Sequence, residues 1–293
     1  MVSSRRSDTV RLAIPSKGRI AQPVRELVEK SGLHLIEGDE RRLIARTLDP
    51  HVEVLFARPI DIPGYVESGA ADLGITGRDM VAERCSQVDE LLDLGIGKAR
   101  LVVAVPEEGA VGDVRDLEGA RVATEFPNLA SAYFQAQGVT VQLVPVSGAC
   151  EATPYLGLAD AIVDLTGSGT TLRTHHLKVI AVVMESSTIL IAGRAAQQRA
   201  KEKIEEITLA LESVIRARGQ CYLMMNVRRS AVDEIRTILP GLSGPTVMDV
   251  ASQEDLVAVH VVVSEDRIYR LISLLRKAGA RDILVVPIER MIR

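Results

Sequence analysis

A short apolar run that passes directly into a turn of small and hydroxyl residues most constrains this fold. The run is Ala161-Ile162-Val163, and the turn is Thr166-Gly167-Ser168-Gly169-Thr170-Thr171. Two glycines permit positive φ, so the backbone can direct several N–H groups to one side. A helix that begins near Thr170 would add its free N–H groups and the positive end of its dipole. A strand, turn and helix in this order indicate an α/β fold and can bind a phosphate.

The two commoner nucleotide-binding motifs do not fit this turn. A P-loop ends in Gly-Lys-Ser/Thr, and no lysine follows Gly169. A dinucleotide fingerprint would need a third glycine at the position of Leu172. The turn therefore binds a phosphate or is an ordinary strand-to-helix turn capped by Ser and Thr. The carboxylate of Asp164, just before it, suits the hydroxyls of a ribose attached to such a phosphate.

Composition excludes several other classes of protein. The chain has 293 residues, of which 47% are hydrophobic and 25% charged, which suits about two or three globular domains. A formal net charge of -4 and the absence of Trp disfavour a nucleic-acid-binding surface. No apolar run reaches the ~18 residues that cross a bilayer. Three scattered cysteines and an N-terminus without an apolar signal segment lead us to expect a cytoplasmic protein.

The first part of the chain alternates short apolar runs with amphipathic segments. Strands are predicted at positions 10–14, 43–47, 52–57 and 73–76, and this alternation is typical of a mostly parallel sheet covered by helices. Ligands of such sheets lie beyond the carboxyl ends of the strands. The loop that follows the first strand is therefore a candidate wall of the site.

Two basic residues stand in that loop, Ser16-Lys17-Gly18-Arg19. Lys17 and Arg19 could neutralise a polyphosphate. A solvated surface pair is the commoner role of Lys and Arg. The loop alone leaves both interpretations open.

A short internal repeat suggests two lobes of similar construction. Gly69-Ala-Ala-Asp72 and Gly157-Leu-Ala-Asp160 share a Gly-x-Ala-Asp pattern, each followed by a buried strand and Thr-Gly. We predict a first lobe of residues 1–100 with 185–215, and a second of residues 101–184 that carries the glycine-rich turn. Because the chain crosses twice between the lobes, we expect hinged closure over a ligand.

The last part of the chain, residues 219–293, predicts a separate ferredoxin-like domain. Its apolar runs and amphipathic segments follow the order βαββαβ. It contains no acid–base pair or activated nucleophile. A regulatory or assembly role therefore fits it better than catalysis.

With these features, the chain resembles the ATP phosphoribosyltransferase family, in the long form that carries a C-terminal regulatory domain. The resemblance covers nearly the whole sequence. Its most specific part matches the family signature in residue type and spacing: Glu151, Gly157, Ala159, Ile162, Asp164, Leu165, Ser168, Gly169, Thr171 and Leu172. Further support comes from Arg58-Pro-Ile-Asp61, Ala71 to Asp79 and Ala123 to Asn128.

The resemblance implies both a fold and a reaction. The fold is two lobes like those of periplasmic binding proteins, with mostly parallel sheets, plus the ferredoxin-like regulatory domain. The reaction is that of ATP with phosphoribosyl pyrophosphate (PRPP), giving N1-(5-phosphoribosyl)-ATP and pyrophosphate with Mg²⁺. It is the first step of histidine biosynthesis.

Roles for individual residues follow from the same resemblance. PRPP would be held by Asp164, Leu165, Thr166, Gly167, Ser168, Gly169, Thr170 and Thr171. ATP would be contacted by Lys17, Gly18, Arg19, Arg58, Asp72, Thr124 and Pro127. The catalytic groups would be Asp164, Glu151, Lys17 and Arg19. Mg²⁺ would be bridged mainly by pyrophosphate oxygens, with Glu151 and Asp164 as further candidate ligands.

Regulation and assembly are also implied by the resemblance. L-Histidine would act as an allosteric inhibitor bound at the C-terminal domain, through Asn226, Ser243, Gly244 and Thr246. A plain turn at Gly244-Pro245 is the alternative. The resemblance further suggests a hexamer built from dimers. A cleft shaped for ATP would also suit AMP as an inhibitor.

The sequence departs from the family pattern at two places and leaves two other functions open. Ala130-Ser131-Ala132 replaces an expected basic run, and Arg173-Thr174-His175-His176 replaces an expected acidic-Asn-Gly stretch. The alternative function is a non-catalytic, two-lobed binding protein for a small anion with an amino acid-sensing domain. A phosphoribosyltransferase that uses another nitrogen base is the second alternative.

Overall fold

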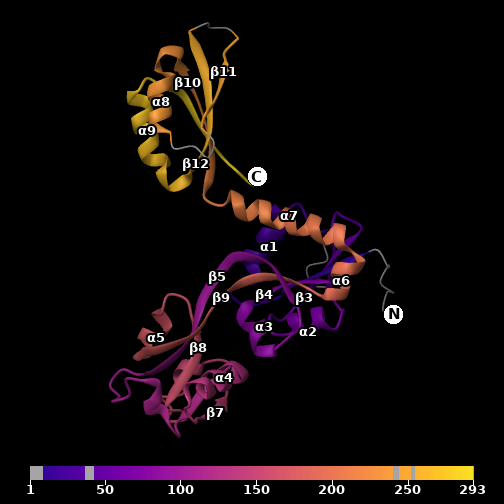
Figure 1. Ribbon diagram of the computed structural model, residues 1–293, viewed down its shortest axis with the longest axis vertical. Coiled ribbons are helices and arrows are strands. Elements are labelled where there is room, and N and C mark those ends of the chain that lie inside the picture. The colour runs from indigo at the N-terminus through magenta and orange to yellow at the C-terminus, as the bar shows by residue number, and fades with distance from the viewer. Residues whose placement is uncertain (1–8, 37–42, 240–243, 252–254, 293) are drawn as a thin grey trace. The chain divides into compact units, whose positions relative to one another are not determined.

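The chain forms two compact units, Met1–Leu209 and Ala210–Arg293, in a computed structural model that describes residues 9–36, 43–239, 244–251 and 255–292 (Figure 1). Helix α7 (Lys201–Ala217) contains the boundary between them. No helix within these described ranges is both long enough and apolar enough to cross a membrane.

The first unit is built on one mixed sheet. Among the described residues its nine strands lie in the order β2-β3-β1-β4-β9-β5-β8-β6-β7. The strand bounds are β1 (Val10–Pro15), β2 (Ile44–Arg46), β3 (Val52–Ala57), β4 (Leu73–Gly77), β5 (Asp89–Pro106), β6 (Arg121–Thr124), β7 (Gln142–Pro145), β8 (Ala161–Thr166) and β9 (Leu177–Ala192). The helices are α1 (Ala21–Lys30), α2 (Ile62–Glu67), α3 (Arg78–Arg84), α4 (Pro127–Gln137), α5 (Thr170–Thr174) and α6 (Arg194–Arg199), with short 3₁₀ turns at Val114–Leu117 and Cys150–Ala152.

Two lobes follow from this strand order. Lobe I comprises β1 to β4 with α1 to α3, and lobe II comprises β6 to β8 with α4 and α5. Strands β3, β1 and β4 pair in parallel in lobe I, as do β8, β6 and β7 in lobe II. The parallel pairs predicted from the alternating pattern are therefore present inside each lobe, and antiparallel pairs join the lobes.

The lobes are joined by β5 and β9, which run through both of them as an antiparallel pair (Figure 1). These strands are 18 and 16 residues long. The pairing shifts register between Asp93 and Ile96 and again between Ile96 and Ala99. Gly95 (φ 63°) and Gly97 (φ 61°) stand at these shifts, in a backbone region that favours glycine. Further shifts lie between Glu90 and Leu92, Leu101 and Val102, and Val103 and Ala104, so the crossing pair is continuous but irregular at several points.

Each lobe has its own apolar core, and the crossing strands contribute to both. The lobe I cluster includes Ile62 and Val66 of α2 together with Ile189 and Ile191 of β9. The lobe II cluster combines β5, β8 and α4, through Leu101, Val103, Val105, Phe126, Ala130, Phe134, Ala161 and Val163. Burial of separate segments of the crossing strands fixes each lobe to the crossing pair.

The internal repeat has a structural counterpart in both lobes. Asp72 accepts a hydrogen bond from the N–H of Arg11 (2.8 Å) and donates its own N–H to the Arg11 carbonyl (2.9 Å). Asp160 makes the same two contacts with Arg121, at 2.9 and 2.8 Å. The aspartate of the Gly-x-Ala-Asp pattern therefore ties the amino ends of neighbouring parallel strands together, once in each lobe.

The second unit has the ferredoxin-like order that the sequence predicts. Its described elements are β10 (Gln220–Arg228), α8 (Val232–Ile238), β11 (Thr246–Asp249), β12 (Leu256–Ser264), α9 (Ile268–Lys277) and β13 (Arg281–Pro287), with 3₁₀ turns at Arg229–Ala231 and Glu265–Arg267. The strands pair antiparallel in the order β11-β12-β10-β13. Alternate residues of β10 and β12 are buried, since one face of the sheet packs against the helices.

Replacing Phe134 with alanine tests the packing of lobe II. The Phe134 side chain is 1% exposed within the lobe II core, so Phe134→Ala should lower the free energy of unfolding by about 3–5 kcal/mol. Denaturant titration measures the change. Gln135→Ala on the exposed side of the same helix is the control and should change stability by less than about 0.5 kcal/mol. Equal effects of the two variants would contradict the described core.

Candidate active site

The glycine-rich turn lies between a buried strand and a short helix. Strand β8 ends at Thr166, and Gly169, with φ 74° and ψ 4°, immediately precedes α5. The hydroxyls of Ser168 and Thr170 are 2.9 Å apart. The order of strand, turn and helix thus agrees with the pattern in the sequence, and the left-handed conformation at Gly169 explains why a glycine stands there.

An arginine from the same helix covers this turn. Arg173 donates from Nη1 to the Ser168 carbonyl (3.3 Å) and from Nη2 to Oγ1 of Thr170 (3.2 Å). A Cβ atom on Gly169 would lie 3.2 Å from Nη1 of Arg173. The departure from the family pattern after the turn therefore places a cation on the turn itself.

Asp164 lies near two other carboxylates just ahead of the turn. Burial, together with the negative charges of Glu151 and Glu125, raises the pKa of Asp164 to about 6. The N–H of Leu165 opposes this by donating to Oδ1 of Asp164 at 2.7 Å. Burial and the same three carboxylates also raise the pKa of the Cys150 thiol, so this cysteine stays protonated near neutral pH.

This acidic group suits a metal that is shared with a substrate. Within the described ranges, no set of three or more His, Cys, Asp or Glu side chains is arranged to hold a metal ion by itself. Mg²⁺ prefers carboxylate oxygens, and it usually keeps waters and substrate phosphates among its ligands. Glu125, Glu151 and Asp164 fit that mode of binding better than a cage made only of protein.

A basic side chain from lobe I reaches the turn of lobe II. Nη1 of Arg19 is 3.1 Å from the position that a Cβ atom on Gly167 would occupy. Nη2 of Arg19 donates to the Gly97 carbonyl in the crossing strand at 3.3 Å. Since glycine has no side chain, the guanidinium can approach the backbone of the turn. Two regions that the sequence marks separately therefore meet in the structure.

Two cavities adjoin this contact. One of about 290 Å³ is lined by both lobes and by the crossing strands, through Gly18, Arg19, Ile20, Pro59, Gly77, Asp79, Met80, Gly97, Ala99, Leu165, Ser186, Ser187 and Thr188. Asp79 is 4% exposed there. Burial raises its pKa, while a hydrogen bond from Ser186 and the charge of Arg19 oppose the rise.

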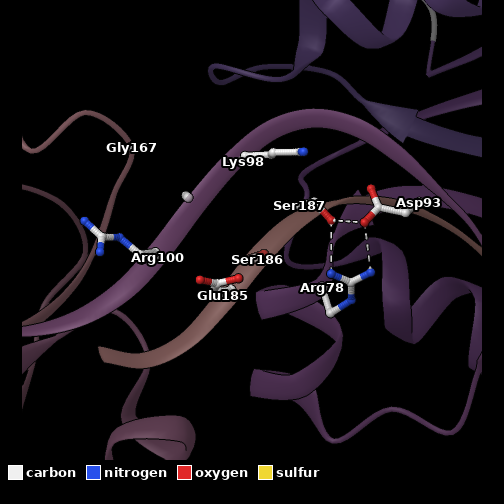
Figure 2. Close-up of a pocket in the computed structure, with 9 residues that line it drawn as sticks. Arg78, Asp93, Lys98, Arg100, Gly167, Glu185, Ser186 and Ser187 are labelled. Atoms are coloured by element: carbon white, nitrogen blue, oxygen red, sulfur yellow. Dashed lines mark hydrogen bonds and ion pairs between the residues drawn. The ribbon is translucent and has the colours of Figure 1, made fainter. Parts of the chain in front are cut away.

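The second cavity, of about 370 Å³, is shown in Figure 2 and is lined by Arg78, Asp93, Lys98, Ala99, Arg100, Gly167, Glu185, Ser186 and Ser187. Arg78 is held by Glu90 (2.6 Å), Asp93 (3.2 Å) and Ser187 (3.1 Å), and the bond to Glu90 is the main cause that raises its pKa. Within the described part of the chain, Lys98 and Arg100 form no ion pair or side-chain hydrogen bond. Their charges remain available to an anion.

The structure places all the predicted ATP contacts except Asp72 at the carboxyl ends of strands. Lys17, Gly18 and Arg19 follow the carboxyl end of β1, and Arg58 follows that of β3, next to the cavity residue Pro59. Thr124 ends β6, where its Oγ1 accepts the N–H of Phe126 (2.8 Å), and Pro127 begins α4. These residues all lie at the carboxyl ends of strands.

Asp72 differs from that group. It lies at the amino end of β4, is 3% exposed, and pairs with Arg199 at 2.5 Å. The structure therefore does not bring Asp72 to the cavity-lining residues, and its carboxylate holds lobe I together instead. The Gly-x-Ala-Asp pattern already contained this signal, because it recurs as Asp160 beside another strand.

Three of the predicted histidine contacts lie in the second unit, and Ser243 falls outside the described residues. Nδ2 of Asn226 in β10 donates to Asp282 at 3.0 Å. Gly244, with φ 81°, lies two residues before Thr246, the exposed first residue of β11. The structure gives no contact that joins Asn226 to these two residues.

The architecture defines the class of protein: a two-lobed α/β protein with a ferredoxin-like second unit, the fold expected from the resemblance. A family model described as ATP phosphoribosyltransferase matches residues 58–213, and one described as HisG, C-terminal domain, matches residues 217–290.

Similar proteins agree with these matches. The ATP phosphoribosyltransferase of Methanocella arvoryzae is 53% identical over 284 residues, covering 97% of this chain and 100% of that relative. The enzyme of the same name from Methanococcoides burtonii is 53% identical over 283 residues, covering 97% and 99%. The solved ATP phosphoribosyl transferase (HisG:HisZ) complex from Thermotoga maritima has a TM-score of 0.64 at 27% identity, covering 71% of this chain and 99% of that chain.

This chain belongs to the ATP phosphoribosyltransferase family, and its C-terminal domain marks the long form. It is therefore a phosphoribosyltransferase, as the resemblance predicted. The reading as a non-catalytic binding protein is not supported by this membership.

Asparagine at position 164 should change the pH dependence of stability. The pKa of Asp164 is raised from 3.8 to about 6 in the folded chain, so its carboxylate favours folding when protonated, below about pH 4. This contribution is lost as pH rises through about 6. Asp164→Asn should therefore match the wild type near pH 4 and become more stable above pH 6, by up to about 3 kcal/mol.

Denaturant titrations of the ligand-free chain between these pH values measure that difference. Asp113→Asn is the control, because Asp113 caps a short turn within lobe II. A stability difference between Asp164→Asn and wild type that does not change with pH would contradict the raised pKa.

Proposed function

We propose that this chain transfers the 5-phosphoribosyl group of PRPP to N1 of ATP, with release of pyrophosphate, as the first step of histidine biosynthesis. The observation that carries the proposal is the meeting of Arg19 from lobe I with Gly167 in the turn of lobe II, in a chain of this family. A polyphosphate substrate seated on the turn would then have cations supplied from the opposite lobe.

The 5′-phosphate of PRPP is assigned to the turn of residues 166–171. Its backbone N–H groups and the hydroxyls of Ser168 and Thr170 are suitable donors to phosphate oxygens. Asp164 would accept hydrogen bonds from the ribose hydroxyls. Because its pKa is about 6, this carboxylate is mostly ionised above neutral pH and could also stabilise positive charge at the anomeric carbon.

The leaving pyrophosphate and the triphosphate of ATP need positive charge. Lys17, Arg19 and Arg58 lie at the carboxyl ends of lobe I strands, and Lys98 and Arg100 line the adjoining cavity. We assign these five side chains to phosphate binding. The reaction needs little covalent help from protein, so holding the adenine N1 in line with the anomeric carbon supplies much of the rate.

Mg²⁺ would be shared between substrate and protein. Glu151 and Asp164, with Glu125 beside them, supply carboxylate oxygens, and pyrophosphate oxygens would complete the coordination. When bound, the ion neutralises charge on the leaving group. The protein residues orient that group and balance the remaining charge.

The proposed division of labour follows the predicted domains. Residues 1–100 with 185–215 and residues 101–184 form the two catalytic lobes, and residues 219–293 form the regulatory domain. L-Histidine would bind the regulatory domain at Asn226, Gly244 and Thr246, together with Ser243. Hexamers built from dimers would connect that site to the lobes by favouring one assembly state. AMP would compete for the nucleotide part of the cleft.

Alanine at Gly169 tests the phosphate turn. The added methyl group would approach Arg173 and strain a backbone with φ 74°, so we expect the KM for PRPP to rise about ten-fold or more. The KM for ATP should change by less than about two-fold. Turnover measured from the ultraviolet absorbance of the product separates the two constants.

Gly138→Ala is the matched control, because Gly138 has φ 69° and nothing within 4 Å of an added Cβ. It introduces the same kind of backbone strain after α4, so KM values should stay at the wild-type level. A Gly169 variant that raises both KM values equally would argue against a turn dedicated to PRPP.

Alanine at Asn226 tests the regulatory site. We expect Asn226→Ala to weaken histidine inhibition at least about ten-fold while leaving turnover without histidine unchanged, since Asn226 lies in the second unit. Thr237→Ala, on the exposed side of α8, is the control. Turnover at increasing histidine concentrations measures both variants. Inhibition unchanged by Asn226→Ala would remove this residue from the site.

A further inference from the structure

A buried carboxylate of lobe I caps a helix of lobe II. Glu83, near the end of α3, is 5% exposed. Its Oε1 accepts the N–H of Asn128 and its Oε2 accepts the N–H of Leu129, both at 3.0 Å. In return, Nδ2 of Asn128 donates to the Glu83 carbonyl at 2.9 Å. Three hydrogen bonds thus join α3 to the start of α4.

This cap differs from an ordinary one in its origin. The first N–H groups of a helix have no partner within the helix, and an adjacent Ser, Thr, Asp or Asn usually satisfies them. The residue before α4 is Phe126, whose side chain makes no capping hydrogen bond. The acceptor instead comes from a residue 45 positions earlier in the sequence, in the other lobe. A carboxylate of lobe I therefore satisfies backbone N–H groups at the start of a lobe II helix.

Other residues of α3 make the same connection. Met80 packs against the lobe II core. Asp79, one residue earlier, accepts the hydroxyl of Ser186 in the crossing strand β9, and its N–H donates to the same hydroxyl at 3.1 Å. Helix α3 therefore touches the crossing pair and lobe II at once. Glu83 lies near the carboxyl end of this helix.

The crossing strands are where the lobes can bend. The register shifts around Gly95 and Gly97 interrupt regular pairing between the two cores. Hinges are commonly a few residues that absorb changes in φ and ψ. A hinge alone does not fix the angle between lobes, and a second contact away from it can do so. The bonds from Glu83 to Asn128 and Leu129 form such a contact.

We propose that Glu83 is a positioning residue that keeps lobe II closed against lobe I before substrates bind. Its consequence for catalysis rests on the proposed function: closure keeps the Arg19 loop beside the glycine-rich turn. Without Glu83 the closed form would be a smaller fraction of the free enzyme. PRPP binding would then have to supply the closing free energy, which raises its apparent dissociation constant.

The test combines a distance measurement with kinetics on the full chain. Gln22→Cys in α1 and Gln135→Cys in α4 place spin labels on exposed positions of the two lobes, in a background where exposed Cys85 is replaced by serine. Labelled chains are diluted with unlabelled ones to remove distances between subunits. Glu83→Ala is expected to broaden the distance distribution toward longer values, and PRPP with Mg²⁺ should restore the wild-type distribution.

Steady-state kinetics should show a change in the KM for PRPP with little change in kcat. Glu83→Ala is expected to raise the KM for PRPP about ten-fold with kcat within two-fold of wild type, since bound PRPP closes the lobes. Glu83→Gln keeps one acceptor oxygen and should be intermediate, and it serves as the test if the alanine variant does not fold. Asp113→Ala is the control, because it removes a cap that lies wholly within lobe II.

Two results would overturn the proposal. One is a distance distribution unchanged by both Glu83 variants. The other is a fall in kcat with KM unchanged, which indicates only a smaller folded fraction. If the wild type shows no transferase activity, the proposed function fails, while the distance measurement still decides whether Glu83 holds the lobes.

Discussion

The antiparallel pairing of β5 with β9 is the interaction on which the rest of the first unit depends. Strand β9 contributes Ile189 and Ile191 to the core of lobe I, while β5 contributes Leu101, Val103 and Val105 to that of lobe II. Separate lobes can therefore share one sheet, and the Arg19 loop of lobe I meets the glycine-rich turn of lobe II beside the crossing pair. In this pair the Gly97 carbonyl accepts a hydrogen bond from Arg19, and the Ser186 hydroxyl donates one to Asp79, so the same strands also position polar groups of the cleft.

Much of the fold follows from local sequence pattern. The apolar runs at 10–14, 52–57, 161–163 and 257–264 lie in strands, because a sheet buries their apolar side chains whichever strand they pair with. The first two thirds of β5, Asp89 to Arg100, mix charged, apolar and glycine residues and give no such signal. Its strand conformation comes from pairing with β9, a partner distant in sequence.

The site likewise combines features that are local in sequence with contacts between distant segments. Asp164 and the turn after it are local features, so the sequence indicates a phosphate site there. Other parts depend on contacts between distant segments: Arg19 against Gly167, Glu125 beside Asp164, and Glu83 at the start of α4. A lone Glu or Arg in a sequence does not reveal its partner. Asp72, predicted as a nucleotide contact, instead pairs with Arg11 and Arg199, and the recurrence of its pattern at Asp160 was the one sequence signal for that structural role.

The central claim is that the two lobes bring PRPP and ATP together at the glycine-rich turn for transfer to adenine N1. The most direct measurement is NMR of the product formed by the wild-type chain from ATP and PRPP that is isotope-labelled at the anomeric carbon, with Mg²⁺. The account predicts a new bond from that carbon to N1 of adenine, with pyrophosphate released in equal amount. Binding of PRPP without transfer, or transfer to a different nitrogen, would contradict it.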